Sequence, residues 1–178
     1  MVEYQRKDRY DINDLRDIMS ILRSPQGCPW DREHKSIRND FIEEVYEAIE
    51  AIDLEDTELL KEELGDVLLQ IIFHCRIEEE KSCFDFDDIC DELCKKLIIR
   101  HPHVFGDITV SDSGEVLKNW DSIKKETKGQ TSYTETLTSV AKSLPALMRA
   151  QKVGKRAMRA GMDFSCVSDA VERVKSET

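Results

Sequence analysis

The sequence predicts an all-α fold, arranged as an antiparallel helical bundle. Apolar residues recur at helical spacing in successive segments, and no segment reads as a convincing strand. Only seven glycines and four prolines occur in 178 residues, which favours helices over a turn-rich β architecture. Because consecutive helices with short connections pack as antiparallel neighbours, we expect one bundle around its own core.

The helices are predicted in order along the chain. Asp11 is the expected N-cap of the first helix and Ser36 that of the second, with a proline- and glycine-containing loop over 24–36 between them. The middle of the third helix is apolar nearly all round, which indicates burial between neighbours or at a subunit contact. The segment HPHVFGD at 101–107 ends the fourth helix. The predicted helices are 11–23, 37–54, 58–81, 85–99, 112–127 and 142–159, with a further one starting at Ser168.

Composition predicts the domain organisation. Residues 1–127 form the expected main helical domain, and the polar stretch 128–139 is typical of a linker. A C-terminal helical segment, 140–178, follows, in which residues 142–159 include six basic and no acidic residues. The last helix reaches the end of the sequence without a cap, which suggests a truncated chain or a disordered tail.

Net charge and cysteine usage exclude several classes of function. A net charge of −11 repels a phosphate backbone, so we expect no general nucleic-acid partner. None of the six cysteines belongs to a CxxC or a zinc-type Cys/His pattern, which favours buried thiols in a reducing compartment. The N-terminus has no apolar signal region, and the longest strongly apolar run, 67–73, is too short to span a membrane. These features predict a soluble cytoplasmic protein.

Two pairs of acidic residues carry the chemistry. Glu44 and Glu47 on one helix, and Glu63 and Asp66 on the next, are spaced i, i+3, so each pair shares a helix face. A short turn joins the helices, so the pairs can face each other. Like charges about 4 Å apart repel by about 4 kcal/mol at an effective dielectric of 20, and a cation between them would offset this. Gly65 lies within the second pair, where close approach of a backbone or ligand would explain a glycine.

The ligand chemistry favours Mg²⁺ or Mn²⁺, because both prefer all-oxygen ligation and bridge to substrate phosphates. A di-iron bundle would need Glu-x-x-His pairs, and none occurs. A solvated acidic helix face is the competing interpretation, since the chain has 37 acidic residues.

Several motifs in order resemble the MazG nucleotide pyrophosphohydrolases. The central signature is EExxE followed by ExxD, and the likeness covers about residues 10–164. The motifs are GCPWD at 27–31, EEVYE at 43–47, EELGDVLLQIIFH at 62–74, RHPHVFGD at 100–107, WDSIKKE at 120–126 and LPALMRAQKVGKRA at 144–157.

The resemblance implies a fold of the all-α NTP pyrophosphohydrolase type, a homodimer, Mg²⁺ dependence and hydrolysis of an NTP to an NMP and diphosphate. It implies that the metal ligands are Glu44, Glu47, Glu63 and Asp66. Glu43 and Glu62 are then candidates to orient or deprotonate the attacking water. Basic and aromatic residues that surround the nucleotide in this family map onto Lys96, Arg100, Trp120 and Lys124. Trp30 is a further candidate to line the base pocket, or else anchors its loop in the core.

Two rival functions stay open on the sequence. One is a non-catalytic helical interaction or regulatory module, against which the cost of the acidic cluster argues. The other is a related metal-dependent phosphohydrolase such as a phosphoribosyl-ATP pyrophosphohydrolase, against which the flanking motifs argue. Long members of the family carry two tandem catalytic units, and residues 144–164 resemble the start of a second one. The chain ends before a second acidic signature, so we expect either a fragment of a two-copy protein or a lost second unit.

Overall fold

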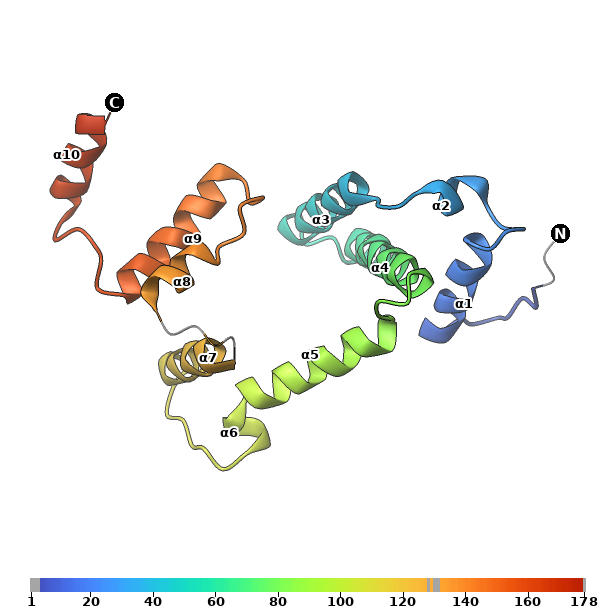
Figure 1. Cartoon of the computed structure of the whole chain (residues 1–178), viewed down its shortest axis with the longest axis horizontal. Coiled ribbons are helices and arrows are strands. Elements are labelled where there is room, and N and C mark those ends of the chain that lie inside the picture. The colour runs from blue at the N-terminus through green and yellow to red at the C-terminus, as the bar shows by residue number, and fades with distance from the viewer. Residues whose placement is uncertain (1–3, 128, 130–131, 178) are drawn as a thin grey trace. The chain divides into compact units, whose positions relative to one another are not determined.

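The computed structural model describes residues 4–127, 129 and 132–177 (Figure 1). These residues form helices, turns and loops without a strand among them, which confirms the all-α prediction. None of the helices in these ranges is long and apolar enough to cross a membrane. The helices are α1 Ile12–Leu22, α2 Pro29–Glu33, α3 Arg38–Asp53, α4 Thr57–Glu80, α5 Phe86–Arg100, α6 Pro102–Phe105, α7 Ser113–Thr127, α8 Tyr133–Thr138, α9 Ala146–Arg159 and α10 Val167–Glu177.

The longer helices lie where the apolar periodicity predicts them, and three short ones were not predicted. α2 and α6 each begin at a proline in a segment predicted as a loop, because proline at the first helical position is favourable although it breaks longer patterns. α8 lies inside the predicted linker, 128–139, and begins with a capping box between Ser132 and Glu135. Ser36 is not a cap, since α3 has Ile37 at this position and no side-chain cap.

The chain divides into two compact units, 1–95 and 96–178, and the boundary falls within α5. This division does not coincide with the boundary predicted after residue 127, and the extents of the domains stay a prediction. Each unit is described by itself below.

In the first unit, α3 and α4 form a helical hairpin, the one clear case here of the predicted antiparallel packing (Figure 1). Asp56 caps α4 by accepting hydrogen bonds from the amides of Glu58 and Leu59, both at 3.1 Å. The buried residues of α3 are Ala48 and Ala51, whose small side chains allow close approach of another helix. The three-residue connection and this packing place the acidic segments of the two helices opposite each other.

The core of the first unit lies between α1 and the C-terminal half of α4. It consists of Met19, Ile37, Ile72, Phe73 and Ile77. The N-cap predicted at Asp11 is confirmed, because its carboxylate accepts from the amides of Asn13 and Asp14. α1 packs against α4, which is therefore supported on one side by α1 and on another by α3.

Most of the apolar stripe of α3 is not in this core. Its exposed members recur every three or four residues, with two neighbours in the middle, and each is exposed by 38% or more: Ile42, Val45, Tyr46, Ile49 and Ile52. Since the single chain leaves a continuous apolar helix face uncovered, this face is a candidate contact surface.

In the second unit, α8 packs against α9. The guanidinium of Arg156 on α9 donates to the hydroxyl of Ser139 at 2.9 Å and to the carbonyl of Thr136. Val140, directly after α8, is 2% exposed. One basic side chain of the basic segment 142–159 thus holds α8 in place.

Candidate metal centre

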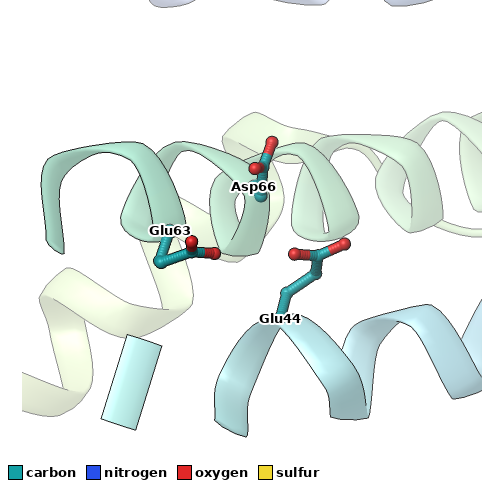
Figure 2. A group of neighbouring side chains, drawn as sticks. All are labelled: Glu44, Glu63 and Asp66. Carbon is teal, nitrogen blue, oxygen red and sulfur yellow. The ribbon is translucent and has the colours of Figure 1, made fainter. Parts of the chain in front are cut away.

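Three carboxylates meet on the hairpin. Glu44 extends from α3, and Glu63 and Asp66 extend from α4, so that one oxygen of each lies within 4.8 Å of the others. Figure 2 shows Glu44 reaching from α3 toward α4, where Glu63 and Asp66 lie. All three are partly buried. The i, i+3 spacing on α4 and the short turn after α3 produce this arrangement directly from the sequence.

The environment of these carboxyls disfavours their charged forms. Burial raises the pKa of Glu44 above its usual value, and the charges of Asp66 and Glu47 raise it further. Burial also raises the pKa of Glu63, followed by the charges of Glu47, Glu62 and Asp66. The charges that act in this direction are all carboxylates, so the cluster concentrates negative charge.

The other predicted acidic residues lie around this cluster. Glu47 is exposed and lies outside the group of three, although its charge reaches both Glu44 and Glu63. Glu43 and Glu62 are exposed on the same two helices. The structure therefore brings three of the four predicted ligands together, with the fourth nearby, and the role of each stays a prediction.

The donor set fits a hard divalent cation. It offers carboxylate oxygens from two facing helices and no histidine or cysteine within the group. Oxygen-only sets suit Mg²⁺ and Mn²⁺ better than zinc or copper. At Gly65, an added Cβ would meet no atom within 4 Å. The close approach of a neighbouring backbone is therefore not found there, and the space over α4 at this point is open.

Comparison with known proteins identifies this region. Residues 32–105 match the model of the MazG nucleotide pyrophosphohydrolase domain. The chain contains a MazG domain. The matched residues include α3, α4 and all members of the carboxylate cluster. The family resemblance predicted from the sequence is thereby confirmed, and the family is metal-dependent.

Curated relatives extend the similarity beyond the MazG domain. The nucleoside triphosphate pyrophosphohydrolase of Escherichia coli K12 is 43% identical over 169 residues, which cover 93% of this chain and 64% of the relative. The nucleoside triphosphate pyrophosphohydrolase/pyrophosphatase MazG of Thermotoga maritima is 41% identical over 168 residues, with the same coverages of 93% and 64%. The uncharacterized protein YabN of Bacillus subtilis is 47% identical over 148 residues, covering 82% of this chain and 30% of YabN. The chain thus spans less than two thirds of the length of these relatives.

The four predicted nucleotide-contacting residues lie in the second unit: Lys96, Arg100, Trp120 and Lys124. The structure brings two of them together, because the guanidinium carbon of Arg100 lies 5.5 Å from the centre of the Trp120 ring. His101 contacts the same indole with its ring centre 4.8 Å away. Trp120 is therefore already engaged by two neighbouring side chains, whereas Lys96 is exposed on α5.

Trp30 lies in the first unit, on α2. It is 53% exposed, with its ring centre 4.0 Å from that of His34 and 6.4 Å from that of Phe73. The indole contacts a core residue but is not itself in the core. The sequence reasoning missed His34 as its partner. The i, i+4 spacing could have revealed the pair only if a helix had been predicted over 29–33.

Proposed function

We propose that this protein is a Mg²⁺-dependent nucleoside triphosphate pyrophosphohydrolase. In this reaction water adds across the anhydride bond between the α- and β-phosphates of an NTP or dNTP, giving a nucleoside monophosphate and diphosphate. The observation that carries the proposal is the convergence of Glu44, Glu63 and Asp66 within 4.8 Å inside a MazG domain. The activity named for the Escherichia coli and Thermotoga maritima relatives supports it.

The acidic residues divide into two proposed roles. Glu44, Glu47, Glu63 and Asp66 would hold Mg²⁺, or Mn²⁺ in its place. The bound cation would supply positive charge that offsets the polyphosphate and polarises its phosphoryl oxygens. Glu43 or Glu62, exposed beside the cluster, would accept the proton of the attacking water.

Nucleotide contacts come from basic and aromatic residues. Lys96, Arg100 and Lys124 would contribute positive charge to the phosphates, and Arg100 suits bidentate contact with phosphate oxygens. The base needs a flat apolar surface, and Trp30 and Trp120 are the two tryptophans of the chain. Nucleoside triphosphates are cytoplasmic metabolites, so we also propose a cytoplasmic location.

We propose a homodimer as the functional form, with the exposed apolar face of α3 as the contact. The face holds large side chains in helical register, including Ile42, Ile49 and Ile52 at 52%, 45% and 55% exposure. Burying such a face against a second copy would remove it from water. Ile49→Glu is expected to lower the sedimentation coefficient from the dimer value to the monomer value. Leu54→Glu, at a more exposed apolar residue that forms the C-cap of α3, serves as the control.

The experiment that tests the proposed function measures Mg²⁺-dependent diphosphate release from the eight common (d)NTPs. Glu63→Gln is expected to lower the rate about 10²-fold, as removal of groups around a metal does. Glu58→Gln, on the same helix with its side chain 85% exposed, is expected to stay within about twofold of wild type, because surface charges contribute little.

Three results would contradict the proposal. Equal rates of diphosphate release for Glu63→Gln and wild type would show that the carboxylate cluster takes no part in the reaction. No hydrolysis of any nucleotide would favour the non-catalytic module. Hydrolysis of phosphoribosyl-ATP alone, supplied in the same assay, would favour a phosphoribosyl-ATP pyrophosphohydrolase.

A further inference from the structure

An exposed tryptophan is held in a fixed orientation on α2. Trp30 is 53% exposed, although large aromatic side chains are usually buried for most of their surface. Its indole touches the edge of Phe73, with the two ring planes at 67°. The remainder of the indole presents a flat aromatic surface to solvent.

His34 supports this indole from one side. The ring centres are 4.0 Å apart and the planes are inclined by 34°. The Nδ1 atom of His34 lies 2.6 Å from the carbonyl oxygen of Trp30, and since a carbonyl only accepts, Nδ1 is the donor. This hydrogen bond fixes the imidazole against the indole, so that two side chains determine the orientation of Trp30.

A buried arginine anchors α2 beneath the tryptophan. The side chain of Arg23 is 4% exposed, pairs with Glu80 through two hydrogen bonds of 2.9 and 2.8 Å, and lies 5.0 Å from the centre of the Phe73 ring. Its NH1 group donates to the carbonyl of His34 at 3.0 Å and to the carbonyl of Asp31. The backbone that follows Trp30 is therefore tied to α4.

The glycine of the GCPWD motif belongs to the same framework. A Cβ at Gly27 would lie 2.2 Å from the carbonyl oxygens of both Ile21 and Leu22, so only glycine lets the chain pass the end of α1. The amide of Cys28 donates to the carbonyl of Leu22 at 2.7 Å and closes this turn. Several buried or constrained groups thus serve to hold a short helix whose most prominent side chain is exposed.

The position of Trp30 relative to the carboxylates suits a nucleotide. Phe73, which contacts Trp30, follows Asp66 by seven residues on α4, which is about two turns on the same helix face and about 10 Å along the axis. An extended nucleotide separates its phosphates from its base by a distance of this order. A triphosphate at the cluster would therefore leave its base near the exposed indole.

We propose that Trp30, supported by His34, is the surface on which the nucleobase of the substrate stacks. The proposal rests on the proposed function and adds its base-binding residue. It selects Trp30 over Trp120, because Trp30 is 53% exposed whereas Trp120 is partly buried. Stacking on an indole tolerates every base, because each has a π face, so a site of this kind accepts many nucleotides.

Tryptophan fluorescence tests the proposal in the full chain. Because the chain has two tryptophans, Trp120→Phe leaves Trp30 as the only indole and Trp30→Phe leaves Trp120. We expect the non-hydrolysable α,β-methylene ATP with Mg²⁺ to quench the fluorescence of Trp120→Phe, and inorganic tripolyphosphate, which has no base, to leave it unchanged. Quenching in Trp30→Phe without quenching in Trp120→Phe would overturn the proposal. So would strong protection of Trp30 from acrylamide in the free protein, since this would mean that a second copy covers the indole.

Steady-state kinetics give an independent measure. Trp30→Leu is expected to raise KM by about 5- to 150-fold, the equivalent of one lost stacking contact, with a smaller change in kcat. Trp30→Phe keeps an aromatic face and is expected to restore much of the affinity, which a purely structural role of the indole would not predict. An unchanged KM for Trp30→Leu would overturn the proposal. If Trp30→Leu does not fold by circular dichroism, the fluorescence of Trp120→Phe still decides.

The failure of this proposal is distinguishable from failure of the proposed function. Hydrolysis that depends on Glu63, combined with unquenched Trp30, would keep the enzyme activity and reject Trp30 as the base-binding residue. Quenching of Trp30 by the nucleotide in a protein that hydrolyses none of the (d)NTPs would keep Trp30 as the base-binding residue and reject the proposed hydrolysis.

Discussion

The two ends of α4 arrange their charges in opposite ways. Near the start of the helix, Glu63 and Asp66 meet Glu44, and burial together with the surrounding carboxylate charges raises the pKa values of Glu44 and Glu63. At the other end, Glu80 meets the buried guanidinium of Arg23, whose hydrogen bond is the largest cause that holds the pKa of this carboxyl below its usual value. Where the fold uses a carboxylate for support, the chain supplies the countercharge itself. At the carboxylate cluster the charges that shift the pKa values of Glu44 and Glu63 are all negative, which is the surrounding that the proposed cation would neutralise.

The largest effect on stability is expected at the paired end. Arg23→Leu would remove the donor to the carbonyls of Asp31 and His34 and would leave Glu80 with Arg76, 3.3 Å away, as its basic partner. We therefore expect the free energy of unfolding to fall by about 2–4 kcal/mol. The value is below that of a fully buried pair because the Glu80 side chain keeps 33% exposure. Urea unfolding measures it, and a loss below about 1 kcal/mol would show that the pair does not anchor α2.

The cluster is expected to show the reverse behaviour. In metal-free protein, Glu44→Gln removes the negative charge of Glu44, which the charges of Asp66, Glu47 and Glu63 repel. The unfolding temperature should therefore rise, by roughly 2–4 °C. A fall in the unfolding temperature of metal-free Glu44→Gln would mean that the carboxylate is stabilising as it stands. Glu58→Gln, an exposed acid on α4, is the matched control and should leave the temperature unchanged.

The two ends should also respond oppositely to pH. The folded-state pKa of Glu80 is lowered from 4.5, so its stabilising contribution is present above that value and is lost as the pH falls through the folded pKa. The folded-state pKa of Glu44 is raised from 4.5, so its penalty is absent below that value and is fully present once the pH exceeds the folded pKa. The free energy of unfolding can be measured in chelator from about pH 3 to pH 8 for wild type, Glu80→Gln and Glu44→Gln. As the pH falls, Glu80→Gln should lose less stability than wild type. Towards neutral pH, Glu44→Gln should become more stable relative to wild type. Parallel curves for all three proteins would contradict the roles given to both Glu80 and Glu44.

The smallest effect is expected for a pair that is not buried. Lys61 and Glu58 lie 3.1 Å apart on α4 with side-chain exposures of 77% and 85%. We expect Lys61→Ala to change the free energy of unfolding by less than about 0.5 kcal/mol, because solvent screens such pairs. A loss comparable with that of Arg23→Leu would show that pairing itself, and not burial of the pair, stabilises this helix.

The sequence predicts the cluster better than its surroundings, for a physical reason. The bounds predicted for α4, 58–81, differ by one residue at each end from Thr57–Glu80, and the i, i+3 spacing forces the acidic pairs onto shared faces. α2 was missed because a five-residue helix that begins at a proline has no readable period. The partner of Arg23 lies 57 residues away, so nothing local indicates the pair.

The exposure of the α3 stripe was not predictable either. An apolar period identifies a face that avoids water, but it does not say whether the same chain or a second copy covers it. Ala48 and Ala51 are the residues of α3 that the structure buries, while the larger side chains from Ile42 to Ile52 stay exposed.

The most direct measurement is the effect of Mg²⁺ on the thermal unfolding of wild type, Glu63→Gln and Glu58→Gln. A cation held by the cluster stabilises the folded state by about 2.7 kcal/mol at a hundred times its Kd. We predict that wild type and Glu58→Gln gain equally and that Glu63→Gln gains little. If Glu63→Gln gains as much as wild type, the carboxylates of α3 and α4 do not form the cation site.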